Sequence, residues 1–202
     1  MEITAKQVKE LRERSGAGMM ECKAALVGAS GDMEKAYELL RKQNKVKAAS
    51  KSGRVAAEGL VHAYIHPGGR IGVLVEINCE TDFAANSDPF KQLVVDVAMH
   101  IAATDPRYLA REEVSPAEIE AEREIYKAQV ADSGKPEAAV AKIIDSKLEK
   151  FYAENCLLEQ PFVKDASMTV RDLVEQTSGK IGENVRVRRF TRYKLGEGVA
   201  KT

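Results

Sequence analysis

Apolar residues recur at helical spacing in three stretches near the start of the chain, and glycine-containing segments at 15–18 and 28–31 separate these stretches. Thr4 opens the first stretch with a capping box, and Asp32 is placed to cap the third. We therefore predict three short helices, the last ending near Lys42. Because a bundle of this size has a marginal core of its own, we expect a docking module rather than a catalytic body.

The pattern changes from helical to extended after Glu58. Residues 60–65 and 71–77 are short apolar runs, and the segment 66–70 between them has the Pro-Gly-Gly composition of a turn. The two runs predict a β-hairpin. Since the second run is nearly all apolar and rich in β-branched residues, we expect other parts of the chain to cover both of its faces.

Helical spacing returns beyond the hairpin, and an alternating stretch follows it. Two of these helices are predicted to begin at a capping residue followed by proline, at Asp88-Pro89 and at Ser115-Pro116. The predicted helices are residues 88–104, 115–132, 136–155 and 169–180, and the predicted last strand is 184–195. The middle two helices predict a helical hairpin inserted between the halves of an antiparallel sheet, so the predicted fold class is α+β.

A short polar segment follows the second strand and holds one large aromatic residue, Phe83, between Asp82 and Ala84. In one interpretation, Thr81 or Asp82 caps a helical turn and Phe83 packs back into the core, as most large aromatic residues do. In the other, Phe83 protrudes from a rigid strand end and enters a partner, because aromatic anchors on loops held by a scaffold often dominate interfaces. Composition leaves both interpretations open.

The total charge supports no general polyanion-binding role, because the 31 Lys and Arg residues balance the 31 Asp and Glu residues. Two local segments, 41–54 and 186–194, are nevertheless basic. The first is either a solvated linker or a phosphate contact, and the second is either a solvated sheet face or a nucleic-acid contact. Reading the first as a linker divides the chain into a module with its linker at 1–54 and an α+β core at 55–202.

The usual signatures of metal sites and of enzymes are missing. His62 and His66 have no third ligand nearby, and the three cysteines are far apart, so we expect no metal ion and no cofactor. Because there is no glycine-rich phosphate loop, no GxSxG and no HExxH, we expect no direct nucleotide binding and no enzymatic activity. Whether Cys79 or Cys156 forms a bridge between molecules stays open.

The first residues lack the basic-then-apolar pattern of a signal peptide, and no apolar run approaches the roughly 20 residues that span a bilayer. We therefore expect a cytoplasmic protein that makes no contact with membranes.

Five stretches of this sequence carry a resemblance. They are KELRERSGAGMM at 9–20 with Cys22-Lys23 after it, GRVAAEG at 53–59, EINCETDF at 76–83, LEQPFVKD at 158–165, and IGENV at 181–185 with Arg189-Phe190. In these stretches, and in their order, the chain resembles the elongation factor Ts family across essentially its whole length. Five stretches in the family order are far more specific than any single short motif. The resemblance implies a three-helix module of the ubiquitin-associated type followed by the α+β core.

The resemblance also implies a function. Members of the family bind elongation factor Tu in its GDP form and speed the release of GDP, so that GTP can enter. In the family a Thr-Asp-Phe loop displaces the magnesium ion bound with the nucleotide, and the matching residues here are Thr81, Asp82, Phe83 and Ala84. Ala84 departs from the valine that the family most often has there, and its smaller side chain reduces one contact of the loop.

The family's N-terminal module packs on the nucleotide-binding domain of the partner. Leu11, Arg12, Met19 and Met20 fall in the matching stretch and are the candidate contacts. The residues alone leave the two methionines open, because methionine serves both as core filler and as an adaptable contact surface. The chain is shorter than family members with a duplicated core and resembles the short form that works as a homodimer.

Two alternatives to the exchange factor stay open at this stage. The first is an RNA-binding protein of the translation apparatus that uses 41–54 and 186–194, although no nucleic-acid partner is expected from the total charge. The second is an adaptor that binds elongation factor Tu without speeding nucleotide release.

Overall fold

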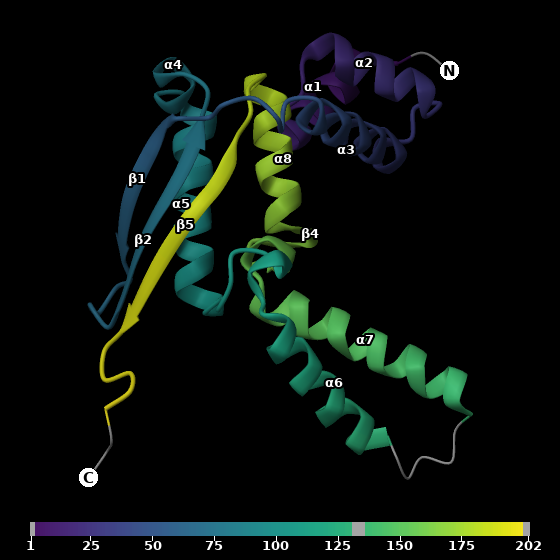
Figure 1. The fold of residues 1–202 in the computed structure, drawn as a ribbon. Coiled ribbons are helices and arrows are strands. Elements are labelled where there is room, and N and C mark those ends of the chain that lie inside the picture. Colours follow the sequence, from purple (N-terminus) through teal and green to yellow (C-terminus); the bar gives the residue numbers. More distant parts are fainter. Residues whose placement is uncertain (1–2, 131–135, 200–202) are drawn as a thin grey trace. The chain divides into compact units, whose positions relative to one another are not determined.

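The computed structural model describes residues 3–130 and 136–199, and it confirms the predicted α+β class (Figure 1). The helices are α1 (Ala5–Ser15), α2 (Met19–Gly28), α3 (Met33–Ala49), α4 (Asp82–Ala85), α5 (Asp88–Thr104), α6 (Pro116–Val130), α7 (Glu137–Asn155) and α8 (Val170–Ile181). The strands are β1 (Glu58–Ile65), β2 (Ile71–Cys79), β3 (Pro161–Phe162), β4 (Asp165–Thr169) and β5 (Arg186–Lys194). Single 3-10 turns lie at η1 (Arg111–Glu113) and η3 (Leu157–Glu159).

By their contacts, the described residues form two compact units, each assembled from three segments of the chain. The first unit comprises Met1–His62, Glu76–Val95 and Asp172–Val187, and the second comprises Ala63–Val75, Asp96–Arg171 and Arg188–Thr202. Helices α1–α3 therefore share a unit with α4 and with most of α8. The division of the chain at residue 54 stays a prediction.

The three N-terminal helices form as the capping signals predict. The Thr4 hydroxyl accepts a hydrogen bond from the Gln7 N–H (3.3 Å), and the Gln7 amide oxygen accepts one from the Thr4 N–H (3.0 Å), which completes the capping box. Asp32 accepts from the first turn of α3. The side chains that these helices bury against one another are Val8, Leu11, Ala17, Cys22, Ala25, Leu26, Ala29, Ala36, Tyr37 and Leu40.

Helix α3 continues to Ala49, so the prediction that it ends near Lys42 was wrong. Tertiary packing against α8 explains the extra turns. Asn44 is buried, and it lies so close to Gly179 that a Cβ atom at Gly179 would come within 2.9 Å of the Asn44 amide. A glycine at that point of α8 lets the two helices approach closely enough to bury this part of α3.

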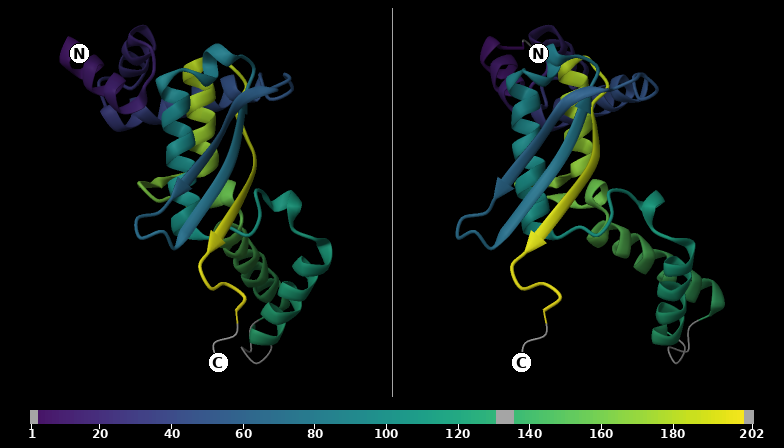
Figure 2. Two further views of the ribbon diagram at one scale, coloured as in Figure 1. Left: turned by 90° about the vertical axis from the view of Figure 1, so that its left-hand side faces the viewer. Right: turned by 60° about the vertical axis from the view of Figure 1, so that its left-hand side comes forward.

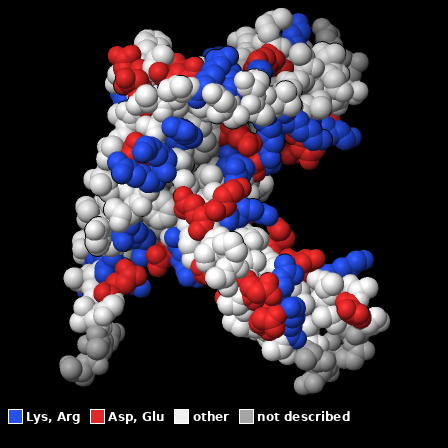
Figure 3. All heavy atoms as spheres, in the orientation of Figure 1, with Lys and Arg blue, Asp and Glu red and all other residues white. Residues whose placement is uncertain are grey.

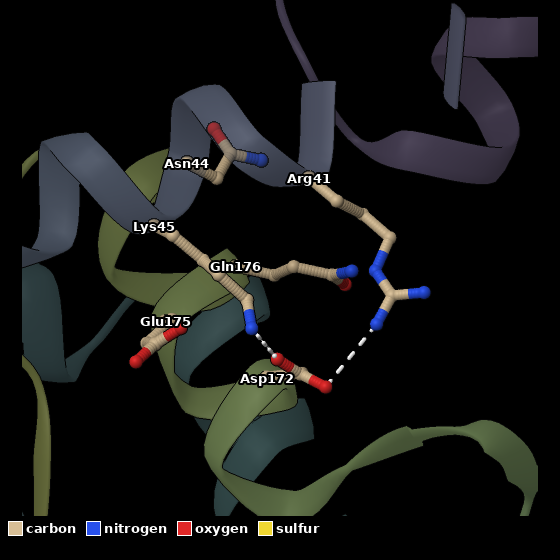
Figure 4. Close-up of a pocket in the computed structure, with 6 residues that line it drawn as sticks. All are labelled: Arg41, Asn44, Lys45, Asp172, Glu175 and Gln176. Atoms are coloured by element: carbon tan, nitrogen blue, oxygen red, sulfur yellow. Dashed lines mark hydrogen bonds and ion pairs between the residues drawn. The ribbon is translucent and has the colours of Figure 1, made fainter. Parts of the chain in front are cut away.

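A buried carboxylate ties the same two helices together (Figure 4). Asp172 of α8 lies between two basic side chains of α3, at 3.1 Å from a guanidinium nitrogen of Arg41 and 2.6 Å from Nζ of Lys45. Because two cations compensate the desolvated carboxylate, its burial is tolerated. Two residues of the basic segment 41–54 therefore contribute to the packing of α3 on α8.

The sheet has the strand order β1-β2-β5. Helix α5 lies along one of its faces (Figure 2). On β2, Val73, Val75 and Ile77 are buried, whereas Leu74 between them is 46% exposed. The prediction that both faces of this strand are covered was therefore wrong. An antiparallel sheet tolerates a solvated face even where the strand sequence is apolar throughout.

The predicted helical hairpin is present, and α6 and α7 lie side by side (Figure 1). Val130, Ile144 and Leu148 form the buried contact between them. The short antiparallel pair of β3 and β4 had not been predicted, because strands of two and five residues carry too little alternation to be recognised in the sequence.

His100 of α5 is buried without charge compensation. Its Nε2 lies 2.9 Å from the Gln160 amide oxygen, and its Nδ1 accepts a hydrogen bond from the Val163 N–H (3.2 Å). The ring is therefore neutral, with its proton on Nε2. Burial lowers the pKa of His100 below its ordinary value, and the hydrogen bond to Gln160 opposes part of that shift.

This arrangement predicts a pH-dependent stability. In the unfolded chain His100 has a pKa of about 6.5, whereas its pKa in the folded protein is lower. Below about pH 6.5 the unfolded state therefore binds a proton more readily than the folded state does. Stability should be complete above about pH 6.5 and should fall as the pH drops below that value, by at most about 1.4 kcal/mol per pH unit from this group. Urea unfolding between pH 7.5 and 5 checks the slope, with His100→Gln as the comparison. Equal slopes in the two proteins would contradict the prediction.

Candidate functional site

The polar segment after β2 forms one turn of helix, α4, that displays Phe83. The Thr81 hydroxyl caps the turn by accepting a hydrogen bond from the Ala84 N–H (3.2 Å). Phe83 is 86% exposed, whereas Ala84 and Ala85 are 2% and 4% exposed. The cap agrees with the interpretation of a capped helical turn, whereas the exposed ring agrees with the interpretation in which Phe83 protrudes. The turn directs its two small residues inward and Phe83 outward.

Glu183, on the connection between α8 and β5, braces the entrance to this turn. One oxygen of its carboxylate accepts hydrogen bonds from the N–H groups of Glu80 (3.1 Å) and Thr81 (3.0 Å), and the other accepts one from the Thr81 hydroxyl (2.7 Å). Because a carboxylate acceptor strengthens each of these bonds, the brace is stronger than three neutral contacts.

Further contacts tie the same connection to the end of β2. The Asn184 N–H donates to the Glu80 carboxylate (2.6 Å), and the Asn184 amide group donates to the backbone carbonyl of Arg54 (2.8 Å). A guanidinium nitrogen of Arg54 lies 3.6 Å from the Glu80 carboxylate. Thus Glu183 accepts from the backbone at the end of β2, and Glu80 in turn accepts from the backbone of the connection between α8 and β5.

Sequence reasoning had not singled out Glu183. It lies about 100 residues from the turn in sequence, so no local pattern links the two. The one available signal was its place in the IGENV stretch that resembles the family.

The Asp82 carboxylate makes no contact that would hold the turn within the part of the chain that the structure describes. Asp82 is exposed, and within the described residues its carboxylate makes no hydrogen bond or ion pair. Its backbone carbonyl accepts from the Asn86 side chain (3.0 Å), which closes the turn on the far side. The turn therefore presents an aromatic ring and a free negative charge side by side.

The cysteine next to the turn is a buried thiol rather than a reactive one. Cys79 donates a weak hydrogen bond to the Thr81 carbonyl (3.2 Å). Burial, and secondarily the Glu183 carboxylate, raises the pKa of Cys79 to about 11, and burial raises the pKa of Cys156 to about 11 as well. All three cysteines are buried and none is in a disulfide. Neither thiol is thus prepared for a bridge between molecules.

The N-terminal helices carry a second candidate surface, a groove of about 660 Å³. Its lining residues are Ile3, Ala5, Val8, Lys9, Arg12, Met19, Met20 and Lys23. Met19 is 58% and Met20 is 76% exposed, which favours the contact-surface interpretation of these methionines over core filler. The structure brings Arg12, Met19 and Met20 together at this groove, but it places Leu11 in the core of the three helices.

The described ranges, 3–130 and 136–199, contain no group of three His, Cys, Asp or Glu side chains that could hold a metal ion. Among the helices of the same ranges, none is both long enough and apolar enough to cross a membrane.

The fold and the site define a structural class: an α+β protein that displays an aromatic residue and a carboxylate on a braced helical turn. Comparison with known proteins identifies the family. The family model described as elongation factor TS matches residues 42–197, which is more than half of the chain. The chain therefore belongs to the elongation factor Ts family, whose members are nucleotide exchange factors of protein biosynthesis.

Individual relatives agree with this assignment and extend it to the N-terminal helices. The elongation factor Ts of Thermoanaerobacter sp. (strain X514) is 58% identical over 197 residues, which are 98% of this chain and 97% of that protein. The elongation factor Ts of Carboxydothermus hydrogenoformans is 59% identical over 199 residues, which are 98% of this chain and 92% of that protein. That of Moorella thermoacetica is 58% identical over 200 residues, covering 99% and 98%.

The exposure of Phe83 predicts that this residue contributes nothing to stability. Phe83→Ala should change the free energy of unfolding by no more than about 0.5 kcal/mol, because an exposed ring buries no surface in the folded chain. Phe90→Ala is the matched control. Phe90 is 0% exposed, and its truncation should cost about 3–5 kcal/mol. Urea unfolding of both variants checks the contrast, and a large loss with Phe83→Ala would mean that the ring packs inside.

Proposed function

We propose that this protein binds elongation factor Tu in its GDP form, disturbs the magnesium site there and promotes release of GDP so that GTP can enter. The observation that carries the proposal is the 86% exposed ring of Phe83 on a turn whose backbone is braced. A large apolar side chain held rigidly in water gains nothing within its own chain. It is suited to insertion into a crevice of a partner.

The mechanism divides between the ring and its neighbours. Mg²⁺ demands nearly ideal octahedral geometry, so a wedge that shifts one of its ligands slightly should weaken nucleotide binding. Full burial of Phe83 supplies about 2–3 kcal/mol. A 1000-fold faster release requires about 4 kcal/mol, so the remainder comes from other docked surfaces. Thr81 caps the wedge, and Ala84 supports it from inside.

Asp82 acts through its charge in this proposal. Its carboxylate has no structural task in the described residues, and it stands beside the ring that enters the partner. A negative charge brought near the phosphates of GDP raises the energy of the bound nucleotide by repulsion.

The groove of the N-terminal helices supplies the second docked surface. Its lining includes the apolar Met19 and Met20 and the basic Lys9, Arg12 and Lys23. A groove lined by apolar and basic side chains fits an amphipathic helix that also carries acidic residues, which we propose to lie on the nucleotide-binding domain of elongation factor Tu. Leu11 acts from within, since it holds together the helices that form the groove.

The exchange is a matter of binding equilibria rather than of covalent chemistry. If the protein weakens the binding of nucleotide to elongation factor Tu, nucleotide weakens the binding of the protein by the same factor. The entry of GTP therefore also releases the exchange factor. In this proposal the protein acts in the cytoplasm, where it needs no cofactor and binds neither nucleotide nor membrane itself.

The basic segments give little support to RNA binding as an alternative. Arg41 and Lys45 pair with Asp172, and Arg192 pairs with Asp105 at 3.0 Å. On the face drawn in Figure 3, Lys and Arg are interspersed with Asp and Glu rather than gathered into one field. A polyanion is bound best where positive charges are clustered and unpaired.

We also propose that two copies of this chain associate through the open face of the sheet. Leu74 alternates with the buried Val73 and Val75, so it points away from the covered face. Ile65 and Tyr193 on the neighbouring strands are 65% and 72% exposed. Exposed apolar residues on three adjacent strands suit packing of this face against its equivalent in a second copy.

Release of a fluorescent GDP analogue from elongation factor Tu tests the exchange proposal. The wild type should speed release, and Phe83→Ala should lose about 30-fold or more of that acceleration. Asp82→Asn should lose a smaller part, because it removes the charge and keeps the shape. Lys91→Ala, an exposed change on α5, is the control and should act as the wild type. If the wild type leaves release unchanged, the chain is an adaptor or an RNA-binding protein, and the proposal fails.

Analytical ultracentrifugation tests the association of two copies. The wild type should sediment as a dimer, and Leu74→Asp should convert it to a monomer because a charge cannot be buried there without a partner. Val163→Asp is the matched control, since Val163 is also exposed, at 52%, but does not belong to the sheet face. A wild type that sediments as a monomer would refute this part of the proposal.

A further inference from the structure

We propose that Glu183 is a positioning residue for nucleotide exchange: its carboxylate sets the orientation in which Phe83 and Asp82 are presented. This inference rests on the proposed exchange function and concerns how the turn is kept ready. Glu183 itself does not enter the partner.

The geometry shows that Glu183 acts through Thr81. The Thr81 hydroxyl donates its only proton to the Glu183 carboxylate (2.7 Å), which leaves its lone pairs to accept the Ala84 N–H (3.2 Å). The carboxylate thereby fixes the direction of the hydroxyl that caps the turn. It also binds the N–H groups of Glu80 and Thr81, which lead into the turn. Three bonds to one carboxylate hold the segment immediately before Phe83.

Glu183 is itself held in place from both sides. Its carbonyl accepts a hydrogen bond from the Ser178 hydroxyl (2.5 Å), and the next residue, Asn184, donates to Glu80 (2.6 Å). Gly182, just before it, has φ +86°, a left-handed conformation that ends α8 after Ile181. The chain leaves the helix sharply and delivers the Glu183 side chain to the end of β2.

The turn needs this external support. Helix α4 has four residues, and an isolated helical turn is unstable because its nucleation cost is not recovered. Phe83 adds no packing of its own, since it is exposed. Without Glu183 the turn would sample other conformations, and ordering it on docking would cost entropy that the braced turn does not lose. Once the N-terminal groove has docked, the cost of ordering the turn slows the entry of Phe83, so Glu183 affects the maximal rate of exchange and not only stability.

Three substitutions at position 183 separate the effect of side-chain length from the effect of side-chain charge. Glu183→Ala removes all three bonds and should lower the maximal rate of GDP release, at saturating exchange factor, by about tenfold or more. Glu183→Asp keeps the charge but withdraws the carboxylate by one methylene group, and it should behave like Glu183→Ala. Glu183→Gln keeps the reach but loses one bond. Its amide oxygen still accepts the N–H groups of Glu80 and Thr81, whereas its NH2 group cannot accept from the Thr81 hydroxyl, so it should lose less than Glu183→Ala and stay within about threefold of the wild type.

The opposite ranking would overturn the inference. If Glu183→Asp matches the wild type and Glu183→Gln does not, the carboxylate acts by its charge on the partner and not by holding the turn. If Glu183→Ala remains folded and exchanges as fast as the wild type, Glu183 positions nothing. Glu197→Ala, an exposed acidic residue after β5, is the matched control and should have no effect.

A double-mutant comparison distinguishes positioning from a general structural role. In the Phe83→Ala background, Glu183→Ala should cost little more, because the ring that it positions is gone. A merely structural defect would add its full cost in both backgrounds. Amide hydrogen exchange in the free protein gives a readout without elongation factor Tu: the Thr81 N–H should lose protection in Glu183→Ala and keep it in Glu183→Gln. Retained protection in Glu183→Ala would overturn the inference.

The outcomes also separate this inference from the proposed function. If the wild type speeds GDP release and Phe83→Ala does not, while Glu183→Ala acts as the wild type, only the positioning role falls. If the wild type has no effect on release, the exchange function falls and the positioning role falls with it.

Discussion

The constraint on which the candidate site depends is the contact of a single carboxylate with a short helical turn. Phe83 is exposed, so nothing about the ring itself keeps it where it is. The Thr81 hydroxyl caps the turn that carries the ring, and the hydrogen bond from this hydroxyl to Glu183 sets the orientation of the hydroxyl. A protein that displays an apolar side chain in water must obtain the order of that side chain from polar contacts behind it, and this chain does so with three hydrogen bonds to one acceptor.

Helix α8 connects that brace to the N-terminal helices within the first unit. Asp172, near its beginning, binds Arg41 and Lys45 of α3, and Gly179 allows Asn44 to pack against it. Glu183 follows directly after its end. One helix therefore contributes both to the packing of the module that carries the methionine groove and to the brace of the Phe83 turn. The two surfaces proposed to bind one partner would benefit from a common rigid element, because less order has to be gained on docking.

Patterns among neighbouring residues predicted some features of this fold and not others. The capping box at Thr4, the Pro-Gly-Gly turn, the helical hairpin and the last strand were predicted because each depends on residues a few positions apart. The length of α3 was not predicted, since its last turns are stabilised by α8 through Asn44. The solvent-exposed face of β2 was also not predicted, because an apolar run in the sequence does not show whether other parts of the chain cover it. For Phe83, composition left the buried and exposed alternatives undecided.

By itself the sequence determined the α+β class, the order of its main elements and, through five stretches in the order found in one family, the membership that points to nucleotide exchange. Only the tertiary structure decided which side chains face outward. It turned Phe83, Met19 and Met20 to solvent and placed Leu11 and Ala84 inside. It also brought Glu183 to Thr81 across about 100 residues of chain. The physical reason is that helices and turns arise from neighbours in sequence, whereas exposure and bracing arise from neighbours in space.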